Sequence, residues 1–170
     1  MSLDLLRMGA ARQHNAVSCG PYALRHALLY LGERHDVERI AFLAGTSDHG
    51  TWPWEMCRAS EALGYKFGTG QWLEGDLART RISYAYHEPA RAAIRGHLDG
   101  GFPVIVCVDA QDHWITIVHA TGRKVTVADS SYYGDHLQVV HELTWVQLLS
   151  RVCVWTPGRT RFDLYPVREL

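Results

Sequence analysis

The chain has 170 residues, of which 47% are hydrophobic and 21% are charged, and its formal net charge at pH 7 is -1. These values are typical of one globular domain that is long enough to bury a core. A nearly neutral chain gives no reason to expect a nucleic acid or a membrane surface as partner. We find neither an apolar run of about 20 residues, as a membrane span needs, nor a secretion signal, and so we expect a cytoplasmic protein.

The four cysteines, Cys19, Cys57, Cys107 and Cys153, are scattered and form no C-x-x-C pair. This spacing argues against a zinc site or a redox dithiol, so no metal and no cofactor is expected. Without a secretion signal, reduced thiols are the better expectation. Cys107 and Cys153 lie in Val-rich segments and are expected to be buried in strands, and Cys57 lies in a predicted helix.

Apolar periodicity and capping signals predict four helices in the first hundred residues. The first begins at Cys19, carries Pro21 in its first turn and stops at Gly32. The second has Asp36 as its cap, and the fourth is expected to start at Pro89. The predicted helices span residues 19–31, 36–45, 52–64 and 88–101.

The second half changes to short Val- and Ile-rich segments that are separated by turns. They predict strands at 103–109, 113–120, 124–130, 137–142 and 151–155, with a short helix at 143–150. Helices followed by strands favour an α+β fold. We expect one domain over 1–170, with a helical half (about 10–100) packed on an antiparallel sheet half (about 101–156), a cleft between them, and a C-terminal tail (157–170).

Cys19 is placed where a reactive thiol would benefit. A helix N-terminus presents unpaired N–H groups and a partial positive charge, which favour a thiolate over a thiol. A thiol that only packs or caps a helix gains nothing from this position, although position alone does not exclude that role. If Cys19 is a nucleophile, we expect it to be more exposed than Cys107 and Cys153.

A nucleophilic thiol needs a base, and ten histidines are available. His113 opens an apolar strand, where its side chain can face a cleft, and His119 lies at the other end of the same strand. Asp129 ends the next strand, and an antiparallel hairpin between the two strands would bring Asp129 beside His113 and not beside His119. An imidazole base also needs an acceptor to orient it, so the hairpin favours His113 as base and Asp129 as its orienting group.

Gln13 lies six residues before Cys19. Acyl transfer through a thiolate produces an oxyanion, which needs hydrogen-bond donors aimed at it. The backbone N–H of Cys19 can supply one donor and the side-chain amide of Gln13 a second. Taken alone, Gln13 would be read as a polar loop residue.

The order of these motifs resembles the peptidase C39 family of papain-like cysteine proteases over roughly residues 10 to 155. The shared features are Gln13, Cys-Gly-Pro at the start of a helix, Gly45-Thr46-Ser47 before another helix, His113 heading an apolar strand, and Asp129 closing the next. The resemblance implies a papain-like fold and a catalytic set of Cys19, His113, Asp129 and Gln13. Many relatives have Asp where this chain has Ser18, and Pro where it has Ser130.

The resemblance implies a stand-alone cysteine peptidase or amide hydrolase that acts through an acyl-thioester on a peptide or peptide-like amide. Two alternatives stay open: an acyltransferase or transpeptidase that uses an amine acceptor, and a non-catalytic peptide-binding module. The aromatic stretches 51–54 and 130–134 can shape a substrate site or cover the edge of the core. The oligomeric state is not predicted.

Overall fold

The computed structural model describes residues 3–68, 84–109, 112–131, 138–152, 154–156, 159–161 and 164–170, and within these ranges the side chains of 84–87, 154–156 and 159–161 are left undescribed. The helices in this part of the chain are α1 (Leu3–Gly9), α2 (Cys19–Leu31), α3 (Val37–Ala44), α4 (Pro53–Ala62), α5 (Tyr84–Asp99) and α6 (Trp145–Val152). The strands are β1 (Tyr65–Phe67), β2 (Val104–Val108), β3 (His113–Ala120), β4 (Lys124–Ala128), β5 (Val140–Thr144), β6 (Val154–Thr156), β7 (Arg159–Arg161) and β8 (Leu164–Glu169).

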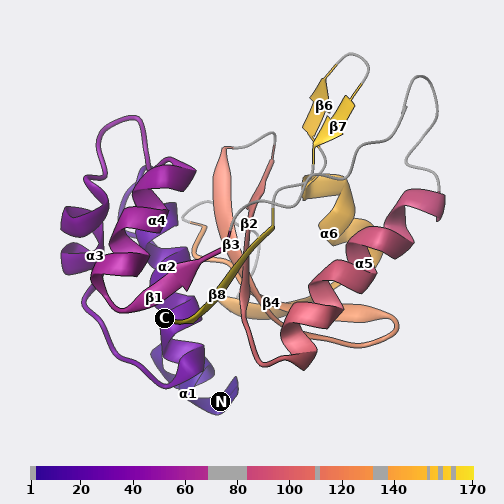
Figure 1. Cartoon of the computed structure of the whole chain (residues 1–170), viewed down its shortest axis with the longest axis horizontal. Coiled ribbons are helices and arrows are strands. Elements are labelled where there is room, and N and C mark those ends of the chain that lie inside the picture. Colours follow the sequence, from indigo (N-terminus) through magenta and orange to yellow (C-terminus); the bar gives the residue numbers. More distant parts are fainter. Residues whose placement is uncertain are drawn as a thin grey trace.

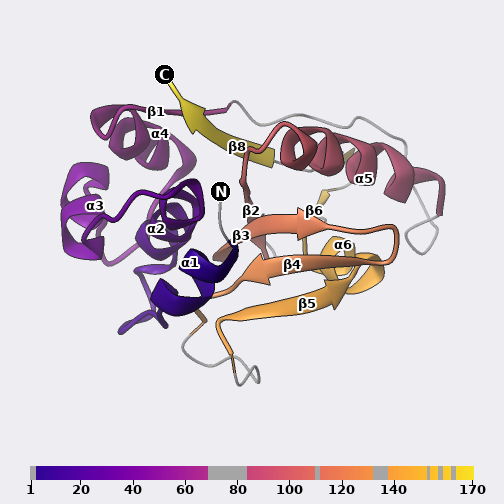
Figure 2. The same cartoon turned by 90° about the horizontal axis from the view of Figure 1, so that it is seen from below.

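One antiparallel sheet organises the molecule (Figure 1). Its strands follow the order β1-β8-β2-β3-β4-β5, and β6 and β7 form a separate hairpin. Helices α2, α3 and α4 lie on one side of the sheet, whereas α5 and α6 lie on the other (Figure 2). The predicted α+β fold is confirmed, with the helices around α2 packed against an antiparallel sheet.

Strand alternation divides the core between the two faces of the sheet, because successive side chains of a strand point to opposite sides. Ile105, Trp114 and Tyr165 face α2, α3 and α4 and form one buried cluster with them. Val106 and Ile115 face the other way and pack with residues of α5 and α6. Helix α2 packs on the first of these sheet faces, and only at the start of α2 does the space between them open as a pocket, with α2 as one wall and the sheet as the other.

The predicted helices at 19–31 and 36–45 are confirmed, and their ends follow the expected signals. Gly32 caps α2 in a left-handed conformation with φ 102°, and its N–H donates to the carbonyls of Leu28 and Leu29. The Asp36 side chain accepts from the backbone N–H of Glu38 at the start of α3. These bonds satisfy backbone groups that helix ends leave without partners.

Two expectations about α5 were wrong. Pro89 lies inside α5, which begins at Tyr84, and not at its start. A proline inside a helix removes one backbone N–H donor and crowds the carbonyl four residues before it, which is why the sequence favoured a helix start at this residue. Also, α5 packs with α6 on the far face of the sheet, although its position in the sequence had placed it in the helical half.

The C-terminal segment 157–170 was expected to be a tail, but β8 inserts into the main sheet between β1 and β2. Pro166 lies inside β8 opposite Val104, and a proline inside an apolar run argues against a strand when only the sequence is read. Helix α1 and strands β1, β7 and β8 had no predicted counterpart. The helix predicted at 143–150 is present as α6, but it runs from Trp145 to Val152. The strand predicted at 151–155 therefore begins too early, since β6 starts at Val154.

Candidate active site

The start of α2 holds Cys19 as its first residue, as predicted. The side chain is buried and only 5% exposed, so the expectation of an exposed thiol was wrong. The reason is the close approach of a neighbouring loop: a Cβ built on Gly20 would lie 2.7 Å from the Cβ of Thr51. Glycine after the cysteine therefore lets the loop before α4 pack directly on the helix start.

On the opposite wall, the side chains of His113 and Asp129 form a close pair. His113 Nε2 lies 2.7 Å from Asp129 Oδ1, although the two residues come from different strand ends. The register of β3 and β4 pairs Thr116 with Ala128, and this pairing brings the residue after β4 beside the start of β3. The proximity expected from the hairpin is confirmed.

His119, the rival base, lies elsewhere. It is exposed and pairs with Thr126 in the middle of the β3–β4 ladder. The register shifts between Ile117 and His119, so His119 does not continue the alternation of side chains that starts at His113. A bulge of this kind inserts one residue into one strand and is not visible in the sequence.

Asp129 is a fully buried carboxylate, with a side chain that is 0% exposed. Besides His113, it accepts from the backbone N–H of Ser131 at 3.0 Å and from Arg151 Nη1 at 3.1 Å. Arg151 also binds Asp109 through two hydrogen bonds, of 2.7 and 3.0 Å. Burial opposes ionisation of Asp129, but these partners outweigh burial and hold its pKa well below the usual range. Arg151 had not been recognised in the sequence as part of this site.

His113 lies between Asp129 and Cys19. Burial of the ring opposes its protonation, but hydrogen bonding to Asp129 and then to Cys19 raises the pKa of His113 to about 9. Because Nε2 is bound to Asp129, Nδ1 is the ring nitrogen left for Cys19. The raised pKa favours the protonated imidazole at neutral pH, with the Asp129 carboxylate on one side and the Cys19 sulfur on the other.

Gln13 is buried next to the strand end that carries Asp129. Its backbone N–H donates to the carbonyl of Ser130 at 2.9 Å, and its side-chain Oε1 accepts from Ser130 Oγ at 3.0 Å. Its Nε2 donates to the carbonyl of Asn15 at 2.7 Å, and a primary amide has a second N–H to offer. Ser130, noted in the sequence only as a departure from the family pattern, thus holds the carbonyl end of this amide, and Asn15 holds the nitrogen end.

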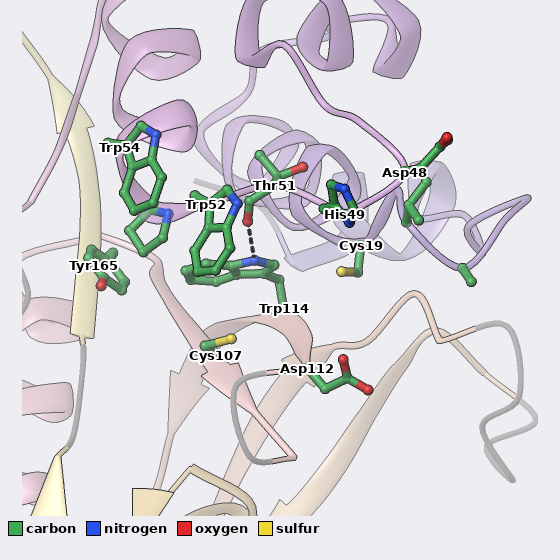
Figure 3. A pocket seen from close by; sticks show the side chains of 14 residues that line it. Cys19, Asp48, His49, Thr51, Trp52, Trp54, Cys107, Asp112, Trp114 and Tyr165 are labelled. Atoms are coloured by element: carbon green, nitrogen blue, oxygen red, sulfur yellow. Dashed lines mark hydrogen bonds between the residues drawn. The ribbon is translucent and has the colours of Figure 1, made fainter.

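A pocket of about 460 Å³ opens beside Cys19, with aromatic side chains over much of its wall (Figure 3). Its lining includes Cys19, Trp52, Trp54, Cys107, Trp114 and Tyr165. Cys107 is half-buried and faces this pocket, so the expectation of a buried strand cysteine was wrong. Cys153 and most of the aromatic stretch 130–134 lie outside the described residues.

The pocket is tied together across the cleft. Trp114 Nε1, from β3, donates to the carbonyl of Thr51 at 2.9 Å, and Thr51 Oγ1 lies 2.9 Å from Thr46 Oγ1. These bonds link the turn at 45–47, which the sequence singled out, to the sheet wall. Within the described ranges, no group of three or more His, Cys, Asp or Glu side chains is arranged to hold a metal ion.

The sequence matches no family model, and no curated protein matches it. Solved structures do match the fold. The peptidase domain of Streptococcus ComA, a bifunctional ABC transporter involved in quorum sensing, is 17% identical with a TM-score of 0.58, and the match covers 92% of this chain and 96% of that one. A double glycine motif protease from an AMS/PCAT transporter, solved with its leader peptide, is 13% identical with a TM-score of 0.58, over 91% and 89% of the two chains.

A third structure, the peptidase domain of Streptococcus mutans ComA, is 14% identical with a TM-score of 0.51, over 94% of this chain and 97% of that one. The resemblance to C39 peptidases is thus confirmed as a likeness of fold. In the part of the chain that the structure describes, no helix has the length and apolar character to cross a bilayer.

Proposed function

We propose that the chain is a cysteine peptidase or amide hydrolase that works through an acyl-thioester on Cys19. The observation that carries this proposal is the position of His113, which is bonded to the buried carboxylate of Asp129 and faces a thiol at a helix N-terminus. A packing cysteine needs no such partner. The likeness of fold to C39 peptidase domains supports the same reading, and a leader peptide bound to one of them supports a peptide or peptide-like amide as substrate.

In the first half of the reaction, His113 carries the proton of Cys19, and the Cys19 sulfur is a thiolate. The sulfur attacks the substrate carbonyl carbon, and the carbonyl oxygen becomes an oxyanion that accepts from the Cys19 backbone N–H and from Gln13 Nε2. The C–N bond then breaks, and His113 gives its proton to the leaving amine. The product of this half is a thioester on Cys19 and a free amine.

In the second half, His113 takes a proton from water, and the resulting hydroxyl attacks the thioester carbonyl. The C–S bond breaks, the acid leaves, and the thiol of Cys19 is restored. Asp129 keeps the imidazole oriented and stabilises its positive charge in both halves.

The free thiols of Cys19, Cys57 and Cys107 support a reducing, cytoplasmic setting.

The test is acyl-enzyme trapping with a peptide library. The parent protein should gain a mass on Cys19 that hydroxylamine removes, and it should release new peptide N-termini. Cys19→Ala should do neither. If the library is left intact and no adduct forms on Cys19 in the folded parent, the proposal fails.

The same experiment separates hydrolysis from acyl transfer. With glycinamide added, a hydrolase should still release mostly the free acid, whereas an acyltransferase should release mostly the amide. If the conjugate with glycinamide dominates the products, the protein is an acyltransferase and not a hydrolase, and the proposed thioester on Cys19 is retained.

A further inference from the structure

The aromatic half of the pocket is built from the loop before α4 and from the sheet. Trp52 and Trp54 stack on each other, with ring centroids 5.1 Å apart and planes 8° apart. They remain 51% and 64% exposed. Two large indoles held together in solvent form an apolar surface of the kind that marks a binding site.

The facing wall is formed by aromatic side chains that pack on one another. Tyr165 stacks on Phe67 with centroids 4.8 Å apart, and it meets Trp114 edge-on at 5.6 Å. The only polar hydrogen of the Trp114 ring is already bonded to Thr51, so Trp114 presents an apolar ring to the pocket. This wall is formed before any ligand arrives, which lowers the entropic cost of binding.

The pocket is polar at its other end. Figure 3 shows the aromatic side chains on one side, with Cys19, Asp48 and His49 on the other. The volume of about 460 Å³ lies within the range of roughly 300–1,000 Å³ for small-molecule sites. A substrate glycine at this place would leave the aromatic surfaces in contact with water, whereas a bulky apolar side chain would cover them.

We propose that the pocket selects substrates with a large apolar, preferably aromatic, side chain close to the carbonyl that Cys19 attacks. The side chain lies between the Trp52–Trp54 pair and the wall formed by Trp114 and Tyr165. This inference deepens the proposed function, since it takes the pocket as the place where the substrate beside the scissile bond is held.

The experiment measures binding without chemistry. Cys19→Ala is titrated against fluorophore-labelled, amidated pentapeptides in a Gly/Ser background, each with one Phe at a different position, and fluorescence anisotropy reports Kd. At least one Phe peptide should bind about 10-fold or more tightly than the Gly/Ser peptide, as burial of one aromatic side chain implies. Equal affinities, or no binding of any Phe peptide at millimolar concentration, would overturn the inference.

The location is tested with matched variants in the same background. Trp54→Ala and Trp52→Ala should remove most of the preference for Phe, and both should keep the melting temperature because the side chains are largely exposed. Phe42→Ala is the control, since Phe42 is an 84% exposed aromatic residue on α3 that does not line the pocket. An equal loss in all three variants, or no loss in the tryptophan variants, would place the binding elsewhere.

This design keeps the two proposals apart. If Phe peptides bind as expected but the parent never forms an acyl-enzyme, the proposed selectivity of the pocket is supported and the proposed hydrolase activity is wrong. If the acyl-enzyme forms with Phe-free and Phe-containing peptides alike and the affinities are equal, the hydrolase activity is supported and the selectivity is wrong.

Discussion

The two walls of the cleft are positioned by different kinds of contact. Cys19 is placed by its immediate neighbours, because the helix begins at that residue and glycine follows it. On the other wall, His113 and Asp129 are 16 residues apart and meet through strand pairing, and Arg151 reaches Asp129 from 22 residues away. Changes on the first wall should therefore act on chemistry, whereas changes on the second should also act on stability.

The largest effect is expected at Cys19. Cys19→Ala removes the proposed nucleophile and should lower turnover by roughly 10⁶-fold, by the precedent of nucleophile removal in a serine protease. The melting temperature should change little, because only a sulfur is lost. Turnover is measured on a peptide found in the library, and melting is followed by circular dichroism.

Cys57→Ala is the matched control for this substitution. Cys57 is a free thiol on α4 that lies outside the pocket and hydrogen-bonds Glu61, so its loss should leave turnover nearly unchanged. A Cys19→Ala protein that keeps its activity would assign the chemistry to another residue.

The second wall is tested at Asp129. Asp129→Asn keeps the shape of the side chain but removes the charge that orients and stabilises His113, and turnover should fall on the order of 10²- to 10⁴-fold. The melting temperature should fall as well, because Arg151 loses a buried ionic partner.

Glu142→Gln is its control on the neighbouring strand. Glu142 pairs with Lys124 at 2.8 Å on the surface, where both side chains are about half exposed, and surface pairs of this kind contribute little. Unchanged turnover in Asp129→Asn would remove Asp129 from the mechanism. If the fraction of unfolded protein accounts for the whole loss of rate, Asp129 has only a structural role.

The third effect is a pH dependence. The pKa of His113 is raised to about 9, so the imidazolium is present below that pH and is lost above it. Without its proton, His113 cannot protonate the leaving amine, and kcat/KM should fall about 10-fold per pH unit above pH 9. A profile of kcat/KM between pH 6 and 10.5 measures this fall, the alkaline limb of the profile.

Asp129→Asn sharpens the same test. The hydrogen bond to Asp129 is one of the causes that raise the pKa of His113, so the residual activity of the variant should begin to fall at a lower pH than that of the parent. A limb that stays at the same pH in both proteins would assign it to a different group.

The contrast between the walls also explains how much the sequence could predict. The start of α2, its cap at Gly32 and the place of Cys19 follow from local signals, and the pairing of His113 with Asp129 follows from one short hairpin. Arg151 joins the site only because α6 packs on the sheet, and Trp114 meets Thr51 across 63 residues. Contacts of this range depend on the packing of the whole domain and leave no local pattern.

The burial of Cys19 shows the same limit. A helix start is visible in the sequence, but the loop that covers it is placed by the fit of Thr51 against Gly20. The side-chain orientation of Gln13 likewise depends on Ser130, 117 residues further along the chain. The residue types of the candidate site were therefore predictable, whereas the side chains that hold them in place were not.

The smallest effect is expected at Ser130, which follows Asp129 in the chain and hydrogen-bonds Gln13. Its hydroxyl donates to Gln13 Oε1 at 3.0 Å. This bond holds the carbonyl end of the Gln13 amide and thereby leaves Nε2 on the opposite side of the amide group. Ser130→Ala keeps the backbone bond between the two residues and removes only the hydroxyl. A neutral hydrogen bond of this kind corresponds to about a 2- to 10-fold loss, which should appear in kcat with KM unchanged, because an oxyanion donor acts in the transition state.

A double-mutant cycle decides whether Ser130 acts through Gln13. Gln13→Ala alone should cost about 10²- to 10³-fold, as for the loss of one oxyanion donor, and Ser130→Ala should then add nothing further. Ser60→Ala is the control, since Ser60 is also fully buried and donates to a backbone carbonyl at 3.1 Å away from the site; it should lower the melting temperature without changing kcat. If the Ser130 and Gln13 effects instead multiply in full, the hydroxyl supports the fold independently of Gln13, and the amide is oriented by its bond to the Asn15 carbonyl.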